Sequence, residues 1–192
     1  MRSGFLVIDK DQDFTSHDVV ALARKSLKEK RIGHAGTLDP MATGVLVLGV
    51  GHATRLLSFI TDGSKTYVAT IRLGSATNTD DAQGEIISTA QPEKIAAITD
   101  LLITQELAKR TGDILQRPSS VSAVKVAGER AYDRVRAGEV FELAARTITI
   151  SSLDVLDIRR TGSRIEIDID VTCSAGTFIR AIARDLGSEL AV

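Results

Sequence analysis

Cysteine is almost absent from this sequence of 192 residues, because Cys173 is the only one. A single cysteine excludes an intramolecular disulfide, and a chain without disulfides suits a reducing compartment such as the cytoplasm. No apolar run approaches the ~18–20 residues that span a bilayer, and an acid at Asp9 interrupts any signal-peptide pattern. We therefore expect a cytoplasmic protein without membrane contact, in which Cys173 is a small buried side chain.

The motifs of nucleotide-dependent and metal-dependent enzymes are missing. The sequence has no Walker pattern and no Cys/His ligand spacing, and His17, His34 and His52 form no cluster along the chain. We therefore expect neither a cofactor nor a metal. A basic excess is also lacking, since the formal net charge is −1, so composition alone argues mildly against nucleic-acid binding.

One stretch of local basic charge runs from Arg24 to Arg31. Five basic residues stand there against one acid, Glu29. The run is explained equally well as a phosphate-binding patch and as a solvated helix face, and the sequence leaves both interpretations open.

Periodic apolar residues predict the regular elements. Tyr67, Ala69, Ile71 and Leu73 share one face by strand alternation, and Gly162 marks the turn of a long hairpin. Strands are predicted at residues 4–9, 45–50, 65–73, 147–159 and 164–172. Helices are predicted at 16–27, with Ser16 as its N-cap, and at 53–60, 91–106, 130–137 and 181–190. A polar loop is predicted at 77–84.

The segment from Gly33 to Gly44 holds three glycines, one proline, one histidine and the acid Asp39. Glycine adopts backbone conformations that other residues resist, and proline fixes φ. The composition predicts a loop of defined shape that presents Asp39, buried beside Val45 and Leu46 at the start of a core strand. A structural turn with Asp39 as a local cap is the alternative.

This segment, Gly-His-x-Gly-x-Leu-Asp-Pro-x-Ala-x-Gly, resembles the active-site motif of the TruB family of tRNA pseudouridine synthases, which isomerise one uridine in the T-loop of tRNA. Cys-Ser-Ala-Gly-Thr-Phe-Ile-Arg, ending at Arg180, is similar to the family's Cys-Ser-x-Gly-Thr-Tyr-Ile-Arg, with Phe178 in place of tyrosine. The link from Lys10 to Ser16 departs from the family's Lys-Pro-x-Gly-Met-Thr-Ser, because its proline and glycine are missing. This departure puts the role of Lys10 in question.

The resemblance implies a role for each candidate site residue. Asp39 is the catalytic carboxylate, and Arg180 is the partner that keeps it ionised where burial would oppose the charge. Tyr67 stacks on the uracil and handles a proton, Phe178 packs near the same base, and His34 fills the place in the RNA that the flipped uridine leaves. Core packing for Tyr67 and a structural role for His34 are the alternatives.

The resemblance also implies a pseudouridine synthase fold, which is α+β with a central mixed β-sheet flanked by helices. The active cleft is expected across this sheet, lined by the loops of Asp39, Tyr67 and Arg180. Residues 1–192 would form one catalytic domain, incomplete at its C-terminus and without the family's small C-terminal RNA-binding module. An insertion at about 117–146 would contact the tRNA T-arm through Lys125 and Arg130, and a hairpin plus a salt-bridged surface helix is the alternative.

We therefore predict a monomeric tRNA pseudouridine synthase that flips its target uridine out of the stack, at a cost of a few kcal/mol, roughly. An RNA-binding or tRNA-folding module without required catalysis is one alternative, and a guide-RNA-dependent rRNA pseudouridine synthase relative is another. The insertion favours the stand-alone enzyme over the guided one. A glycoside or nucleoside hydrolase is disfavoured, because such enzymes generally need a second carboxylate.

Overall fold

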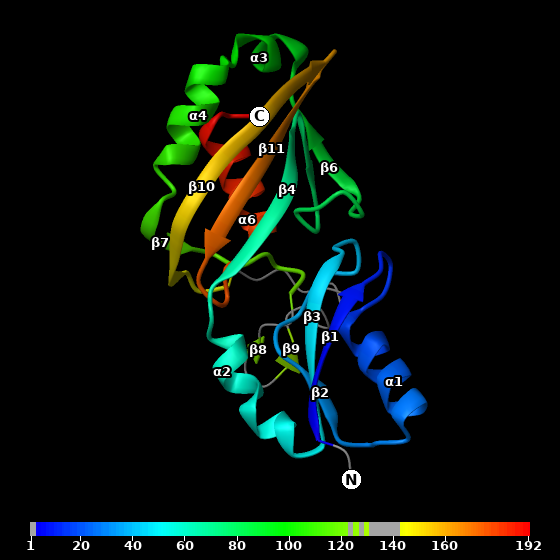
Figure 1. The fold of residues 1–192 in the computed structure, drawn as a ribbon. Helices are drawn as coiled ribbons and strands as arrows, with labels where there is room; N and C mark the ends of the chain where they lie inside the picture. The colour runs from blue at the N-terminus through cyan, green and yellow to red at the C-terminus, as the bar shows by residue number, and fades with distance from the viewer. Residues whose placement is uncertain (1–2, 123–124, 127–128, 131–142) are drawn as a thin grey trace. The chain divides into compact units, whose positions relative to one another are not determined.

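Two compact units make up the protein in this computed structural model, Met1–Gly63 and Ser64–Val192. The structure describes residues 3–122, 125–126, 129–130 and 143–192 (Figure 1). Each unit has a hydrophobic core of its own, since the two buried clusters share no residue. None of the helices in these ranges is long and apolar enough to cross a membrane.

The first unit is built on a small antiparallel sheet. Its strand order is β1 (Gly4–Lys10), β3 (Gly44–Val50) and β2 (Ile32–His34). Helix α1 (Ser16–Leu27) contributes to the core beneath this sheet, and a 3-10 turn, η1 (Gly51–Leu56), leads into α2 (Leu57–Thr61). The buried core residues are Val19, Val20, Ile32, Leu46, Leu48 and Val50.

The N-terminus of α1 is capped by Thr15 rather than by the predicted Ser16. The Thr15 hydroxyl accepts a hydrogen bond from the Asp18 amide at 3.1 Å, and the Asp18 carboxylate accepts one from the Thr15 amide at 2.9 Å. This reciprocal capping box satisfies two amides that the first helical turn leaves unpaired. Ser16 is the first helical residue, and its hydroxyl bonds elsewhere.

The second unit contains a four-stranded sheet in the order β4 (Lys65–Leu73), β11 (Arg164–Cys173), β10 (Arg146–Thr161) and β7 (Gly112–Gln116). The α+β class is confirmed, but a single mixed sheet was the wrong prediction. Every strand pairing among the described residues is antiparallel, and these strands form more than one sheet. The reason is that β10 and β11 form a hairpin, turning at Gly162 with φ 58°, and that β4 and β7 each run against the hairpin strand beside them.

Helices cover one face of this sheet. The helices are α3 (Pro92–Ala97), α4 (Asp100–Ala108) and α6 (Ile179–Glu189), and Figure 1 shows α4 and α6 against the same side of the strands. The strand predicted at 164–172 is confirmed as β11, and its apolar residues Ile165, Ile167, Ile169 and Val171 are all fully buried.

Some elements differ from the sequence prediction. The single helix expected at 91–106 is divided into α3 and α4, since Thr99 starts a new helix by accepting the Leu102 amide at 3.2 Å. The expected loop at 77–84 lies within a hairpin of β5 (Ser75–Thr77) and β6 (Ile86–Thr89). A two-residue pair, β8 (Lys125–Val126) and β9 (Glu129–Arg130), follows β7, and the helix predicted at 130–137 extends outside the described residues.

Candidate active site

The loop that carries Asp39 lies in the first unit and connects β2 to β3. It is shorter than predicted, because Gly33 and His34 belong to β2. Gly36 and Gly44 have φ of 97° and 110°, backbone conformations that glycine adopts without a steric penalty. Asp39 is half-buried. The expected burial beside Val45 was wrong in one respect, since Val45 is 70% exposed.

Lys10 ties this loop to the link before α1. Its side chain is buried, and Nζ donates to the carbonyl oxygens of Asp11 at 2.9 Å, Phe14 at 2.7 Å and Pro40 at 3.2 Å. Three acceptors match the three donors of an ammonium group, so the buried charge is solvated by backbone. The Asp13 amide adds a hydrogen bond to the Pro40 carbonyl at 2.8 Å. Lys10 therefore positions the loop, even though its link lacks the family's proline and glycine.

Ser16 holds the other side of Asp39. Its buried hydroxyl accepts from the Leu38 amide at 3.0 Å and donates to the Leu38 carbonyl at 3.3 Å. The residues immediately before and after Asp39 are thus each bonded to a side chain from another element.

His34 contacts the same loop from the end of β2. Its Nδ1 lies 2.5 Å from the Gly36 carbonyl oxygen, and because a carbonyl only accepts, Nδ1 carries the proton in this contact. The ring also meets His17 edge-on, with centroids 5.2 Å apart. His34 therefore has a structural part in the loop, and its predicted RNA role stays a prediction.

The remaining predicted residues that the structure describes belong to the second unit. Tyr67 lies on β4 opposite Val171, half-buried against the core. This is the packing that was considered as its alternative role, and the catalytic role of Tyr67 stays a prediction. Lys125 and Arg130 are partners in the β8–β9 pair, but their side chains lie outside the described part.

Phe178 is the N-cap of α6, and two residues that the sequence did not single out hold it. The buried Gln116 amide accepts from the Phe178 amide at 2.8 Å and donates to its carbonyl at 3.0 Å. The Arg146 guanidinium lies over the ring, 5.2 Å from its centroid, and donates to the Gly176 carbonyl. A cation at this distance is attracted to the ring face. Burial lowers the pKa of Arg146 below its ordinary value.

Arg180 lies in the first turn of α6 and is not an ordinary surface arginine, since its side chain is 13% exposed. Its guanidinium donates to the carbonyl oxygens of Thr79 at 2.7 Å and Val121 at 3.0 Å. It also lies 3.4 Å from the Asp81 carboxylate. These contacts fix the guanidinium within the second unit.

The β5–β6 loop that receives Arg180 is itself well ordered by hydrogen bonds. The Asp81 carboxylate accepts from the Thr79 hydroxyl at 2.7 Å and the Gln83 amide at 3.0 Å, while the Asp81 amide donates to the Thr77 hydroxyl at 3.1 Å. The sequence indicated only a polar loop here. Its run of Thr, Asn and Asp residues was the available signal, because these side chains commonly bond nearby backbone.

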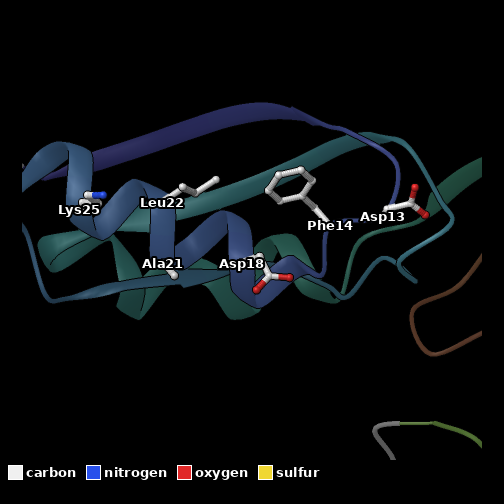
Figure 2. A pocket seen from close by; sticks show the side chains of 6 residues that line it. All are labelled: Asp13, Phe14, Asp18, Ala21, Leu22 and Lys25. Atoms are coloured by element: carbon white, nitrogen blue, oxygen red, sulfur yellow. The ribbon is translucent and has the colours of Figure 1, made fainter.

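A surface pocket beside α1 contains none of the predicted site residues. Figure 2 shows the Leu22 side chain extending towards the Phe14 ring, with acids and a lysine around them. Its lining residues are Asp13, Phe14, Asp18, Ala21, Leu22 and Lys25. Within the described ranges, no group of three or more His, Cys, Asp or Glu residues is arranged to hold a metal ion.

Comparison with known proteins identifies the class to which this chain belongs. Residues 24–179 match the family described as TruB family pseudouridylate synthase (N terminal domain). That match spans most of the chain and includes the loop of Asp39 and the strand of Tyr67. The chain belongs to the TruB family of pseudouridylate synthases.

Individual relatives are more specific. The chain is 53% identical to tRNA pseudouridine synthase B of Corynebacterium diphtheriae, covering 99% of this chain and 63% of that protein. It is 56% identical to the protein of the same name from an Arthrobacter species, covering 99% and 62%. The chain thus spans just over three fifths of the length of these curated relatives.

Among solved structures, the chain resembles one in a Cbf5-Nop10-Gar1 complex, with a TM-score of 0.69 and 28% identity. The match covers 98% of this chain and 45% of that one. A second similar chain is in an H/ACA RNP bound to a substrate RNA, with a TM-score of 0.66 and 25% identity. These likenesses support the pseudouridine synthase fold.

Proposed function

We propose that this protein isomerises a flipped-out uridine in the T-loop of tRNA to pseudouridine. The observation that carries the proposal is the loop of Asp39, whose motif matches the family and whose backbone is bonded on both sides by Ser16 and Lys10. A rigid loop is what a catalytic carboxylate needs, since small misplacements of a reacting group reduce rate steeply. The identity above 50% to relatives named tRNA pseudouridine synthase B supports the choice of substrate.

The reaction breaks the N1–C1′ bond, turns the uracil and forms a C5–C1′ bond. The C5 proton is then removed and N1 ends protonated, so atoms and charge balance. In this proposal Asp39 is the essential carboxylate, acting on C1′, on the base or on a ribose proton, and Arg180 favours its ionised form. Tyr67 stacks on the base and handles the C5 proton, and Phe178 packs near the same ring.

Recognition of the tRNA would use residues outside the catalytic loop. We propose that the insertion at about 117–146 contacts the T-arm, with Lys125 and Arg130 near phosphates, and that His34 occupies the space left by the uridine. RNA loops are recognised through shape, phosphates and stacking on exposed bases. A stack on the extruded base contributes ~1–3 kcal/mol, which offsets part of the cost of flipping.

The direct test is to incubate the protein with an unmodified tRNA transcript and map pseudouridine, with Asp39→Asn as the matched control. Product in the T-loop without any guide RNA, and none with Asp39→Asn, supports the proposal. Bound tRNA without product would favour an RNA-binding or tRNA-folding module. Product only after a guide RNA is added would favour the guide-dependent relative.

A further inference from the structure

Arg184 is a second arginine on α6, four residues after Arg180, so the two side chains project from neighbouring positions on one helix face. Its Nη2 donates to the Arg117 carbonyl at 2.7 Å, and its Nη1 lies 3.2 Å from the Asp80 carboxylate. Its Nε and Nη2 also bond the carboxylate of Asp185 at 2.9 and 2.7 Å. Arg184 therefore joins α6 to two loops distant in sequence.

The two arginines use the same pair of loops in the same way. Arg180 pairs with Asp81 and donates to a backbone carbonyl of the 117–121 segment. Arg184 pairs with Asp80 and donates to another carbonyl of that segment. A planar guanidinium with five donors suits such multiple contacts, which a lysine would not reproduce. The arrangement forms two parallel bridges from one helix to one pair of loops.

Asp80 is the residue on which the outer bridge depends. Its φ of 59° is left-handed, a conformation that costs energy for residues other than glycine but that Asp and Asn tolerate best. Its carboxylate pairs with the guanidinium of Arg184. The Asp80 side chain is 15% exposed and the Arg184 side chain is 28% exposed. Because Thr79 and Asp81 flank this turn, the position of Asp80 also sets the direction of the two groups that bind Arg180.

We infer that Arg184 and Asp80 are positioning residues for Arg180. Their ion pair holds the 79–81 turn, and the Arg184 hydrogen bond to the Arg117 carbonyl holds the 117–121 segment, where both can bind the Arg180 guanidinium. Neither Arg184 nor Asp80 touches the uridine. The Arg184 hydrogen bond to the Arg117 carbonyl also fixes the start of the 117–146 segment to α6. The catalytic consequence rests on the proposed function, whereas the structural consequence for Arg180 does not.

The test uses Asp80→Asn, Arg184→Gln and Arg184→Lys in the full chain. Asparagine tolerates the left-handed turn, so Asp80→Asn removes charge while keeping the backbone. The exposed pair of Arg160 and Asp100, in the same unit, supplies the control Arg160→Gln. For Asp80→Asn and Arg184→Gln we expect single-turnover rates ~10-fold to 100-fold lower than wild type, with tRNA dissociation constants within about threefold of wild type. Arg184→Lys should restore part of the rate that Arg184→Gln loses. The control Arg160→Gln should change neither quantity.

A second readout does not require activity. The NMR signal of the Arg180 guanidinium is observed in protein labelled with nitrogen-15 arginine and is assigned by its loss in Arg180→Lys. In Asp80→Asn and Arg184→Gln this signal should shift and its protons should exchange faster with solvent, whereas Arg160→Gln should leave both unchanged. An unchanged Arg180 signal in folded Asp80→Asn would overturn the inference. Rate losses that add in a variant carrying both Asp80→Asn and Arg184→Gln would overturn it as well. If wild type makes no pseudouridine, the proposed function fails, and the Arg180 signal still decides the positioning role.

Discussion

Tyr67 poses the clearest question at the scale of single residues, because its half-buried ring packs against the core while the family resemblance implies a chemical role for it. Tyr67→Phe keeps the ring volume and removes the hydroxyl. If the hydroxyl handles the C5 proton, turnover should fall by ~10²–10⁴-fold, with tRNA affinity little changed. Single-turnover rates and tRNA affinities of wild type and variant measure both quantities.

Tyr67→Ala is the companion variant. It also removes the stacking surface, so it should weaken tRNA binding where Tyr67→Phe does not. A Phe variant with full activity would leave Tyr67 as a packing residue only.

Lys10 gives a second prediction, about the stability of the catalytic loop. Lys10→Met keeps an apolar stem but removes the ammonium that bonds the carbonyls of Asp11, Phe14 and Pro40. A hydrogen bond to a charged group contributes about 1.5–3 kcal/mol to stability. We therefore expect Lys10→Met to lower the free energy of unfolding by about 2 kcal/mol. Denaturant unfolding measures this loss.

Hydrogen exchange locates the effect of Lys10→Met. The Asp13 amide, which donates to the Pro40 carbonyl, should exchange faster, while amides of β1 remain protected. Lys25→Met removes an exposed lysine of the same unit and serves as the control. Equal exchange at Asp13 in both variants would contradict the positioning role of Lys10.

The sequence predicted which residues carry the motifs but not what holds them. The contact of Lys10 with Pro40 spans 30 positions, and that of Arg180 with Thr79 spans 101. No local pattern encodes such pairs, because they depend on how distant loops come together in the fold. Lys10 was put in question because its link lacks the family's proline and glycine, and the adjacent acids of the β5–β6 loop were assigned only to a polar loop.

At the scale of elements, prediction succeeded where burial repeats with a fixed period. Strand β11 alternates four buried apolar residues with polar ones, and its period identified it. The division between α3 and α4 was missed, because Thr99 caps a new helix without interrupting the apolar pattern around it. Strands β2 and β5 have three residues each, which is too short for an alternation to be recognised.

The exposed face of the four-stranded sheet gives a prediction about pH. Hydrogen bonds from Arg159 and then Thr70 lower the pKa of Asp168 from 3.8 to about 2. A carboxyl with a depressed pKa in the folded state contributes stability that is present above its ordinary value and is lost as pH falls through the lower one. The advantage of wild type over Asp168→Asn should therefore be largest above about pH 4 and be lost as the pH falls through about 2.

Thermal melting of both proteins between pH 7 and 2 checks this expectation. Arg159→Gln removes the main cause of the shift and leaves the Thr70 hydrogen bond, so in that background Asp168→Asn should change the pH dependence less. The effect should be small, because both groups lie at the surface. A difference between the two proteins that does not shrink as the pH falls from about 4 to about 2 would rule out the ionised carboxylate as its source.

At the scale of the whole molecule, the greater length of the relatives gives a prediction about tRNA affinity. The chain spans 62% of the Arthrobacter relative, and the family resemblance implies a small C-terminal RNA-binding module. Joining the remaining part of that relative after Val192 should tighten tRNA binding. It should also steepen the salt dependence, by about 0.7–0.9 in log–log slope for each added phosphate contact.

Titrations of both proteins against tRNA at several salt concentrations measure affinity and slope together. An unrelated domain of similar length, joined at the same position, controls for size. Equal affinities and equal slopes for the original and extended proteins would contradict the prediction.

The order of the strands has a consequence for the time course of synthesis. The three strands described in the first unit are complete once the ribosome has passed Val50, whereas β4 pairs, among the described strands of its sheet, with β11 alone. About 90 residues separate the end of β4 from Arg164, where β11 begins. At roughly 5–20 residues per second, β4 waits about 5–20 s for its partner. During that interval the unpaired edges of the strand that carries Tyr67 can pair with neighbouring nascent chains. We therefore expect the risk of aggregation to be greatest when translation is slow or when many ribosomes translate close together.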